Sequence, residues 1–157
     1  MDKIKITEGD LNARDMRIVI VAARFNEFIV ESLLKGSISC LRRHGATDSA
    51  IEIIRVPGAH EMPLAVEKVA ATRRADGIVA LGAVIRGATP HFDYVSGECM
   101  RGVAAVGREH GIPIGMGVLT TDSIEQAIER AGTKAGNKGE EATLAVIEMI
   151  SLIRKLD

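Results

Sequence analysis

The sequence predicts an α/β fold, a single layered domain in which a central, mostly parallel four-stranded sheet has helices on both faces. Short runs rich in Val and Ile alternate with longer amphipathic segments, the pattern of repeated strand–helix units. One run, 77–85, is apolar almost throughout, as expected of a strand buried on both faces. The length of 157 residues suits one domain, so residues 1–157 are treated as a single unit.

The expected elements follow from these patterns. Strands are expected at 17–23, 51–56, 77–85 and 113–119, and helices at 25–44, 64–73, 92–110, 121–131 and 138–156. Ser123 and Gln126 have the spacing of a capping box at the start of the fourth helix. Residues 1–6 carry Ile4 and Ile6 in alternation and are a candidate for an N-terminal edge strand that pairs with a neighbouring subunit.

Composition and charge exclude several classes of protein. Lys and Arg number 20 against 21 Asp and Glu, so the chain lacks the basic balance of a nucleic-acid-binding protein. The longest apolar stretch, 77–85, is too short to span a membrane, and no apolar signal-peptide block follows the charged N-terminus. Cys40 and Cys99 stand alone, without the spacing of a metal or redox motif, which favours a reducing cytoplasm.

The carboxyl ends of parallel strands are where such sheets bind ligands. The loops expected there are 24–26, 57–61, 86–91 and 120–121, and they bring together Gly, Thr, Asn, Glu and two His. We therefore expect one site at this edge of the sheet, built from all four loops.

The four histidines fall into two groups. His44 and His110 each precede a glycine at the end of an expected helix, where a cation favours the helix dipole, so both are interpreted as structural. His60 and His91 lie in the strand-end loops, and a group with an ordinary pKa of about 6.5 can move a proton at neutral pH. For His91 function is favoured over a solvated loop position, whereas for His60 the two interpretations are balanced.

Two segments are candidates for binding an anion, and one aromatic residue for binding a flat ring. Gly87, Ala88 and Thr89 precede a helix and can offer N–H groups and a hydroxyl to a phosphate. Residues 130–139 form a basic, glycine-rich loop, for which a solvated turn is the alternative. Phe25 directly follows a strand and is a candidate platform for a heterocycle.

The better-known motifs for metals and nucleotides do not fit. Lys138 lacks the following Ser or Thr of a Walker loop, and His60-Glu61 is not followed by the second histidine of a zinc protease. The glycines of 115–117 lie inside an expected strand rather than at its end. A metal ion, ATP and NAD are therefore disfavoured.

Four segments form a recognisable set: 24–26 (Arg-Phe-Asn), 56–61 (Val-Pro-Gly-Ala-His-Glu), 82–91 (Gly-Ala-Val-Ile-Arg-Gly-Ala-Thr-Pro-His) and 128–139 (Ile-Glu-Arg-Ala-Gly-Thr-Lys-Ala-Gly-Asn-Lys-Gly). Together they closely resemble the lumazine synthase family, and the likeness runs in order from about residue 17 to residue 153. The resemblance implies a flavodoxin-like fold and the penultimate step of riboflavin biosynthesis. In that step 5-amino-6-(D-ribitylamino)uracil condenses with 3,4-dihydroxy-2-butanone 4-phosphate to 6,7-dimethyl-8-ribityllumazine, releasing phosphate and water without a cofactor.

The resemblance also implies a role for each matching residue. His91 would be the proton-transfer residue, and the phosphate would be held by Ala88, Thr89 and Arg130. The pyrimidine and its ribityl chain would be bound by Phe25, Asn26, Ala59, His60, Glu61, Ala83, Val84, Ile85, Met116 and Lys138, the last also close to the phosphate. Position 83 is Ala where Thr is common in the family. Position 116 is Met where Phe is usual and covers the substrate from the neighbouring subunit.

The family likeness further implies homopentamers with sites at subunit interfaces and, in some members, a hollow icosahedral shell of pentamers, with riboflavin synthase as a candidate partner. The last helix supports burial between subunits, because its apolar residues cover more than one core stripe: Leu144, Val146, Ile147, Ile150 and Ile153.

Two other functions are kept as alternatives. A non-enzymatic flavin-binding module leaves His91 and Arg130 without a role, and an inactive shell-forming scaffold does not explain why the whole set of site residues is present.

Overall fold

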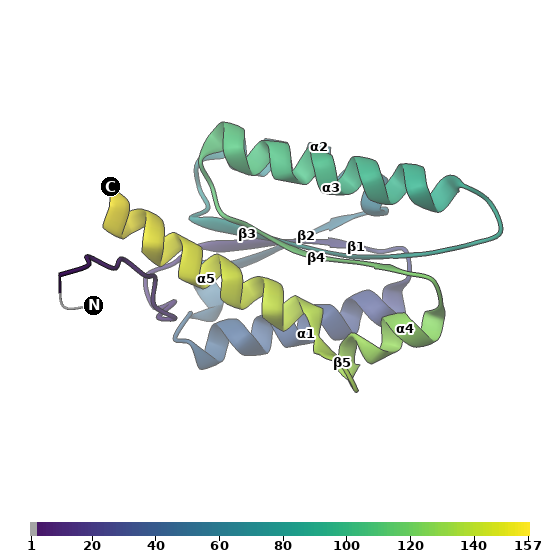
Figure 1. Cartoon of the computed structure of the whole chain (residues 1–157), viewed down its shortest axis with the longest axis horizontal. Coiled ribbons are helices and arrows are strands. Elements are labelled where there is room, and N and C mark those ends of the chain that lie inside the picture. The colour runs from purple at the N-terminus through teal and green to yellow at the C-terminus, as the bar shows by residue number, and fades with distance from the viewer. Residues whose placement is uncertain (1–2) are drawn as a thin grey trace.

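The core of the fold is a four-stranded parallel sheet, seen in the computed structural model of the chain, which describes residues 3–157 (Figure 1). The strands are β1 (Ile18–Ala23), β2 (Ile51–Val56), β3 (Gly77–Ile85) and β4 (Ile114–Thr121), in the order β2-β1-β3-β4. The chain moves outward from β1 to β2 and then crosses to the other side, so the order reverses between β1 and β3. This order is that of flavodoxin-like sheets, whose ligands bind at such a switch point.

Helices cover both faces of the sheet, as the sequence predicts. On one face lie α2 (Met62–Thr72) and α3 (His91–His110), and on the other lie α1 (Glu27–Arg43), α4 (Ile124–Glu129) and α5 (Lys138–Leu156) (Figure 1). Alternate residues of β1 serve both cores, since Ile18 and Ile20 pack toward α1 and α5 while Val19 and Val21 pack toward α2 and α3. Burial on both faces explains why β1 and β3 are apolar at almost every position.

Several short elements are not predicted by the sequence patterns. Two 3₁₀ turns, η1 (Asp48–Ala50) and η2 (Ala59–Glu61), precede β2 and α2. The glycine-rich loop is a short hairpin of β5 (Ala131–Thr133) and β6 (Gly136–Asn137), and residues 132–136 are exposed to solvent. Gly132 and Gly136 have φ values of 111° and 78°, a region open to glycine at little cost, and so allow the hairpin to fold back.

The start of α4 shows a variant of the predicted capping box. Ser123 Oγ accepts a hydrogen bond from the Gln126 N–H at 3.2 Å, as expected. The side chain of Gln126 instead reaches one residue further back, where its Oε1 accepts from the Asp122 N–H at 2.8 Å.

Among the described residues, no helix is both long enough and apolar enough to cross a membrane.

Two expectations about subunit contacts have different outcomes. In the apolar stripe of α5, Val146, Ile147 and Ile150 are buried in the chain's own core and so do not indicate burial between subunits, whereas Leu144 and Ile153 are only partly buried and leave that expectation a prediction. Since α5 packs against the sheet and also against α1, it needs a wide apolar face within one chain. Residues 3–13 form no strand here and leave Ile4 and Ile6 exposed, while Met1 and Asp2 lie outside the described residues. Pairing of this segment with a neighbouring subunit stays a prediction.

Candidate active site

The third strand extends past its neighbour at the switch point. β1 pairs with β3 only as far as Ala22 with Leu81, whereas β4 stays paired with β3 as far as Thr121 with Ile85. In the part of the chain that the structure describes, residues 82–85 therefore have no strand partner on the β1 side. Among the described residues, Ala83 O accepts a hydrogen bond from Asn26 Nδ2 on that side, and the remaining backbone groups there have no partner strand and can bond to a ligand.

A pocket of about 220 Å³, here called the switch-point pocket, occupies this edge of the sheet. Its lining residues are Phe25, Asn26, Ala59, Ala83, Val84, Ile85, Gly87, Thr89, His91, Phe92 and Val95. Most of them are apolar, and Asn26, Thr89 and His91 supply the polar side chains. An apolar pocket with few polar groups suits a flat heterocyclic ligand.

Phe25 and Asn26 are positioned by the turn between β1 and α1. The Phe25 N–H donates to Pro57 O at 2.9 Å, and the side chain of Phe25 remains 73% exposed, so it is free to stack on a ring. Asn26 has left-handed backbone angles (φ 63°), which Asn tolerates better than most residues, and α1 starts one residue after it. Its Nδ2 donates to Ala83 O at 2.8 Å across the crevice. That carbonyl is thus already bonded on one side, and its second lone pair remains for a ligand.

His91 is the first residue of α3 and lines the switch-point pocket with Thr89. Its side chain is exposed, in keeping with a group that exchanges protons with a ligand or with water. The N-terminus of this 20-residue helix carries the positive end of its dipole, which favours an anion beside Thr89.

Met116, Arg130 and Lys138 lie in a different pocket, here called the β4 pocket, of about 330 Å³. Its lining residues are Met100, Met116, Val118, Leu119, Thr120, Thr121, Arg130, Ala135, Lys138 and Glu141, and none of them lines the switch-point pocket. Loop 120–121 therefore meets the loop after β3, where the Arg86 N–H donates to Thr121 O at 2.8 Å, but Thr120 and Thr121 line the β4 pocket and not the switch-point pocket. The reason is that β4 is the edge strand and β3 separates it from the switch point.

Arg130 and Lys138 are the cations of the β4 pocket. The Lys138 N–H donates to Arg130 O at 2.9 Å, so the two residues are joined through the backbone. Arg130 Nη1 donates to Gln126 O at 3.0 Å, and Lys138 Nζ lies 3.3 Å from Glu141 Oε2. Arg130 Nη1 also lies 3.8 Å from Glu129 Oε2, so each cation has one carboxylate neighbour. Both cations are partly exposed, and an anionic ligand in this pocket competes with these carboxylates for them.

The remaining predicted residues lie beside these pockets. His60 and Glu61 are exposed on η2, next to the lining residue Ala59, and Ala88 is exposed between Gly87 and Thr89. The structural interpretation of the other histidines holds: His44 Nδ1 is 2.7 Å from Cys40 O, and His110 Nε2 is 2.9 Å from Glu67 Oε1.

Some lining residues were missed by sequence reasoning. Val95 follows His91 at a spacing of four on α3, and this helical spacing is the signal that places both on one face. Phe92 has no such signal. Glu141 follows Lys138 at a spacing of three on α5, and this spacing is the signal for their ion pair. Met100 carries no such signal, because its place in the β4 pocket depends on how α3 meets the edge strand.

The switch-point pocket with its histidine, and the cationic β4 pocket, define an α/β enzyme of the flavodoxin-like fold that handles a flat ring and an anion. The 6,7-dimethyl-8-ribityllumazine synthase family matches residues 15–154 of the chain. The chain is also 54% identical over 156 residues to the 6,7-dimethyl-8-ribityllumazine synthase of Lawsonia intracellularis (strain PHE/MN1-00), covering 99% of each sequence. It therefore belongs to the 6,7-dimethyl-8-ribityllumazine synthase family, the lumazine synthases.

Proposed function

We propose that this chain carries out the reaction of its family at the switch-point pocket, completed by the β4 pocket of a neighbouring copy. The chain is a transferase of riboflavin biosynthesis. It condenses 5-amino-6-(D-ribitylamino)uracil with 3,4-dihydroxy-2-butanone 4-phosphate to 6,7-dimethyl-8-ribityllumazine, with release of phosphate and water. The observation that carries the residue assignment is the convergence of Phe25, Asn26 and His91 on one pocket at the switch point.

The switch-point pocket is the proposed site of the pyrimidine. Phe25 stacks on the ring, and the backbone edge of 83–85, which has no partner strand on the β1 side, bonds to the polar groups of the ring. Asn26 closes the pocket through its bond to Ala83 O. The ribityl chain extends over Ala59 toward His60 and Glu61, whose exposed polar groups suit a polyol.

Proton transfer and phosphate release are assigned to the loop before α3 and to the β4 pocket. The amine of the pyrimidine attacks the ketone, and a first water leaves to give a Schiff base. Phosphate then leaves, and the ring closes with loss of a second water. His91 moves the protons of these steps, because it lines the pocket beside Thr89 and a histidine can serve as both general acid and general base. Ala88 and Thr89 hold the phosphate from one side, and Arg130 with Lys138 stabilises the negative charge that grows on it as it leaves.

This assignment needs two copies of the chain, because Thr89 and Arg130 line separate pockets. A heterologous contact, in which unlike surfaces of two copies meet, joins such half-sites and closes into a ring. Met116 then covers the pyrimidine of the neighbouring copy. Phe28, Leu64 and Tyr94 are 78%, 66% and 71% exposed and supply apolar surface for such a contact. The proposed ring is the homopentamer of the family, with a shell of pentamers as the larger assembly.

Four further points belong to the proposal. Residues 1–157 act as one domain, and the reaction uses no cofactor. The chain works in the cytoplasm, where thiols stay reduced; burial raises the pKa of both Cys40 and Cys99 to about 11, and both are free. Riboflavin synthase is the proposed protein partner.

The activity is tested by mixing the purified protein with both substrates and following the fluorescence of the product. Turnover above the rate of the substrates alone is expected. A flavin-binding module would instead purify with a coloured ligand and show no turnover, and a scaffold would assemble without turnover.

The shared site is tested by complementation between His91→Ala and Arg130→Ala. In either variant alone, every shared site carries one substitution. In a ring assembled at random from both variants, a site is intact where the copy that contributes its His91 half is Arg130→Ala and the copy that contributes its Arg130 half is His91→Ala. About one interface in four meets this condition. Activity should therefore reappear when the two variants are co-expressed. If the mixed assemblies are no more active than the separate variants, the two half-sites do not come from different copies.

A further inference from the structure

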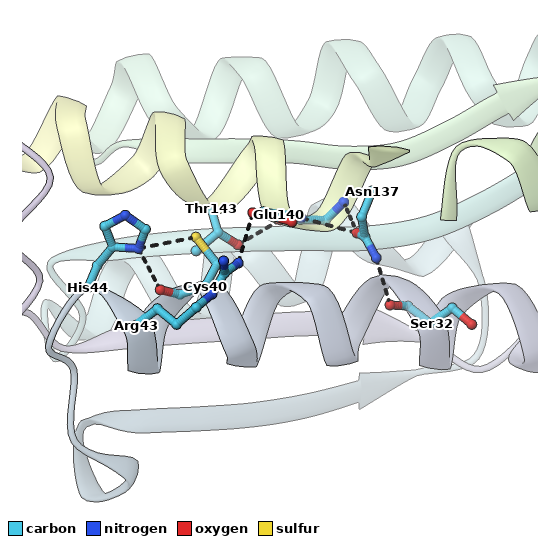
Figure 2. A network of polar contacts seen from close by, with 8 residues as sticks. Ser32, Cys40, Arg43, His44, Asn137, Glu140 and Thr143 are labelled. Carbon is cyan, nitrogen blue, oxygen red and sulfur yellow. Dashed lines mark hydrogen bonds and ion pairs between the residues drawn. The ribbon is translucent and has the colours of Figure 1, made fainter. Parts of the chain in front are cut away.

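Asn137 joins three parts of the structure through one side-chain amide (Figure 2). It is the last residue of β6 and the N-cap of α5. Its Oδ1 accepts from the N–H groups of Gly139 and Glu140 at 2.9 and 3.1 Å. Its Nδ2 donates to Ser32 O of α1 at 3.0 Å, a contact between residues 105 positions apart.

The space around this amide is closely fitted. A Cβ atom added at Gly36, one turn along α1 from Ser32, would overlap the amide of Asn137. A Cβ atom at Gly132 on the paired strand would lie 3.4 Å from Nδ2. The amide is therefore held between α1 and the hairpin, and Gly36 leaves the room that it occupies, whereas a Cβ atom at Gly132 would make only ordinary contact with it.

The hairpin connects Asn137 to both cations of the β4 pocket. Arg130 directly precedes β5 and Lys138 directly follows β6. Asn137 pairs with Ala131 across the hairpin, and the Lys138 N–H donates to Arg130 O at 2.9 Å. A shift of the hairpin on α1 therefore moves both cations together.

We infer that Asn137 is a positioning residue for the anion site: its bond to Ser32 O fixes the hairpin on α1 and so sets where Arg130 and Lys138 stand. The inference rests on the proposed function, which assigns the phosphate of the substrate to these two cations. Asn137 itself lines neither pocket, so its effect passes through the backbone of the hairpin.

The chemistry of the amide allows its two tasks to be separated. An aspartate at 137 keeps an acceptor for the first N–H groups of α5 but cannot donate to Ser32 O, and it places a carboxylate oxygen against that carbonyl. An alanine loses both the cap and the bond to α1. Asn137→Asp is therefore the informative variant, and Asn137→Ala shows the sum of both losses.

A control is available in the same pair of helices. Ser37 Oγ and Thr143 Oγ1 are 2.6 Å apart between α1 and α5, and both residues are fully buried. Thr143 also donates to Gly139 O at 2.7 Å, so it keeps a partner when Ser37 is replaced. Ser37→Ala therefore weakens the packing of α1 on α5 without touching the hairpin.

The test measures the KM of each substrate, kcat and the midpoint of thermal unfolding for Asn137→Asp, Asn137→Ala, Ser37→Ala and Arg130→Lys in the assembled enzyme. We expect Asn137→Asp to raise the KM of the phosphorylated substrate by about five-fold or more, the worth of one hydrogen bond, with the KM of the pyrimidine nearly unchanged. Ser37→Ala should lower the unfolding midpoint and leave both KM values unchanged.

Two results would overturn the inference. If Asn137→Asp keeps both KM values of the unmodified protein, Asn137 only caps α5. If Ser37→Ala raises the same KM as strongly as Asn137→Asp, the effect comes from general loosening. In either case a raised KM in Arg130→Lys leaves the proposed function standing. An unchanged KM in Arg130→Lys moves the phosphate to Lys134 or Lys138 and overturns the inference for Arg130.

Discussion

Arg86 Nε donates to Asp122 Oδ1 at 2.8 Å, so the residue that follows β3 is fastened to the residue that follows β4. The Arg86 N–H also donates to Thr121 O at 2.8 Å, and the guanidinium lies 4.3 Å from the centre of the Phe92 ring. The bond to Asp122 raises the pKa of Arg86 still further, so the charge is always present. Loop 87–90, with the proposed phosphate ligands Ala88 and Thr89, starts directly after this residue and ends at α3.

The first prediction is that Arg86→Lys loosens this loop. Lysine keeps the charge but not the planar group that lies on Phe92 and bonds to Asp122. Because the ion pairs are exposed, we expect a modest effect, about a two- to five-fold rise in the KM of the phosphorylated substrate. Steady-state kinetics with each substrate varied in turn measures it. Arg101→Lys, in an exposed pair with Glu98 on α3, is the control and should change neither KM.

A second prediction concerns proton transfer by His91. His91→Ala should lower kcat by roughly 10²–10⁴-fold with little change in either KM, before the rate of the uncatalysed condensation is reached. His110→Gln, at the other end of α3 and paired with Glu67, should keep its activity. A His91→Ala enzyme with full turnover across the neutral pH range would show that another group moves the proton.

The third prediction separates the two pockets by ligand. Arginine can grip a phosphate with two parallel hydrogen bonds, which lysine cannot reproduce, so Arg130→Lys should weaken the binding of inorganic phosphate by about ten-fold. Phe25→Ala removes a stacking face and no charge, so it should weaken a pyrimidine analogue by about ten-fold and leave phosphate unchanged. Calorimetric titration of both ligands into both variants is the measurement. Equal loss of both ligands in both variants would contradict the division, and no loss in Arg130→Lys would move the anion to Lys134 or Lys138.

The strands and main helices could be predicted because their burial has a regular period. β2 and β3 begin and end as expected, and α5 does so because Asn137 caps it at the residue where the helical period starts. By contrast, α1 begins at Glu27 rather than Phe25, because Asn26 takes a left-handed conformation. The spacing of apolar residues along the helix does not reveal this conformation. The β5–β6 hairpin is short, polar and rich in glycine, so it lacks the alternation that marks a strand.

The candidate site could be predicted residue by residue but not as an arrangement. Phe25 and His91 follow strand ends, which the sequence shows directly. The separation of Met116 and Arg130 from them depends on β4 being the edge strand, and strand order is a property of the fold rather than of any local pattern. Likewise, Asn137 lies against Ser32 only because α1 and α5 share one face of the sheet (Figure 2).

The last prediction concerns the acid stability of the opposite end of the sheet. Asp76 accepts hydrogen bonds from the Arg17 N–H at 2.7 Å and from its Nη2 at 3.0 Å, and Arg154 lies 3.6 Å away. Partial burial raises the pKa of Asp76, but the bonds and charges of the two arginines outweigh burial and leave the pKa below its ordinary value. Its ionised form therefore stabilises the fold above the unfolded-state pKa of about 3.9, and this contribution is lost as the pH falls through the lower folded-state value.

We expect Asp76→Asn to lower the unfolding midpoint at pH 7, and the difference from the unmodified protein to shrink below about pH 4. Asp48→Asn is the matched control, since Asp48 also pairs with an arginine but is 70% exposed against 19% for Asp76, and it should shift the midpoint little at any pH. Thermal unfolding of the three proteins from pH 7 to pH 3 decides the matter, and a difference for Asp76→Asn that stays constant over this range would rule out the ionised carboxylate as its source.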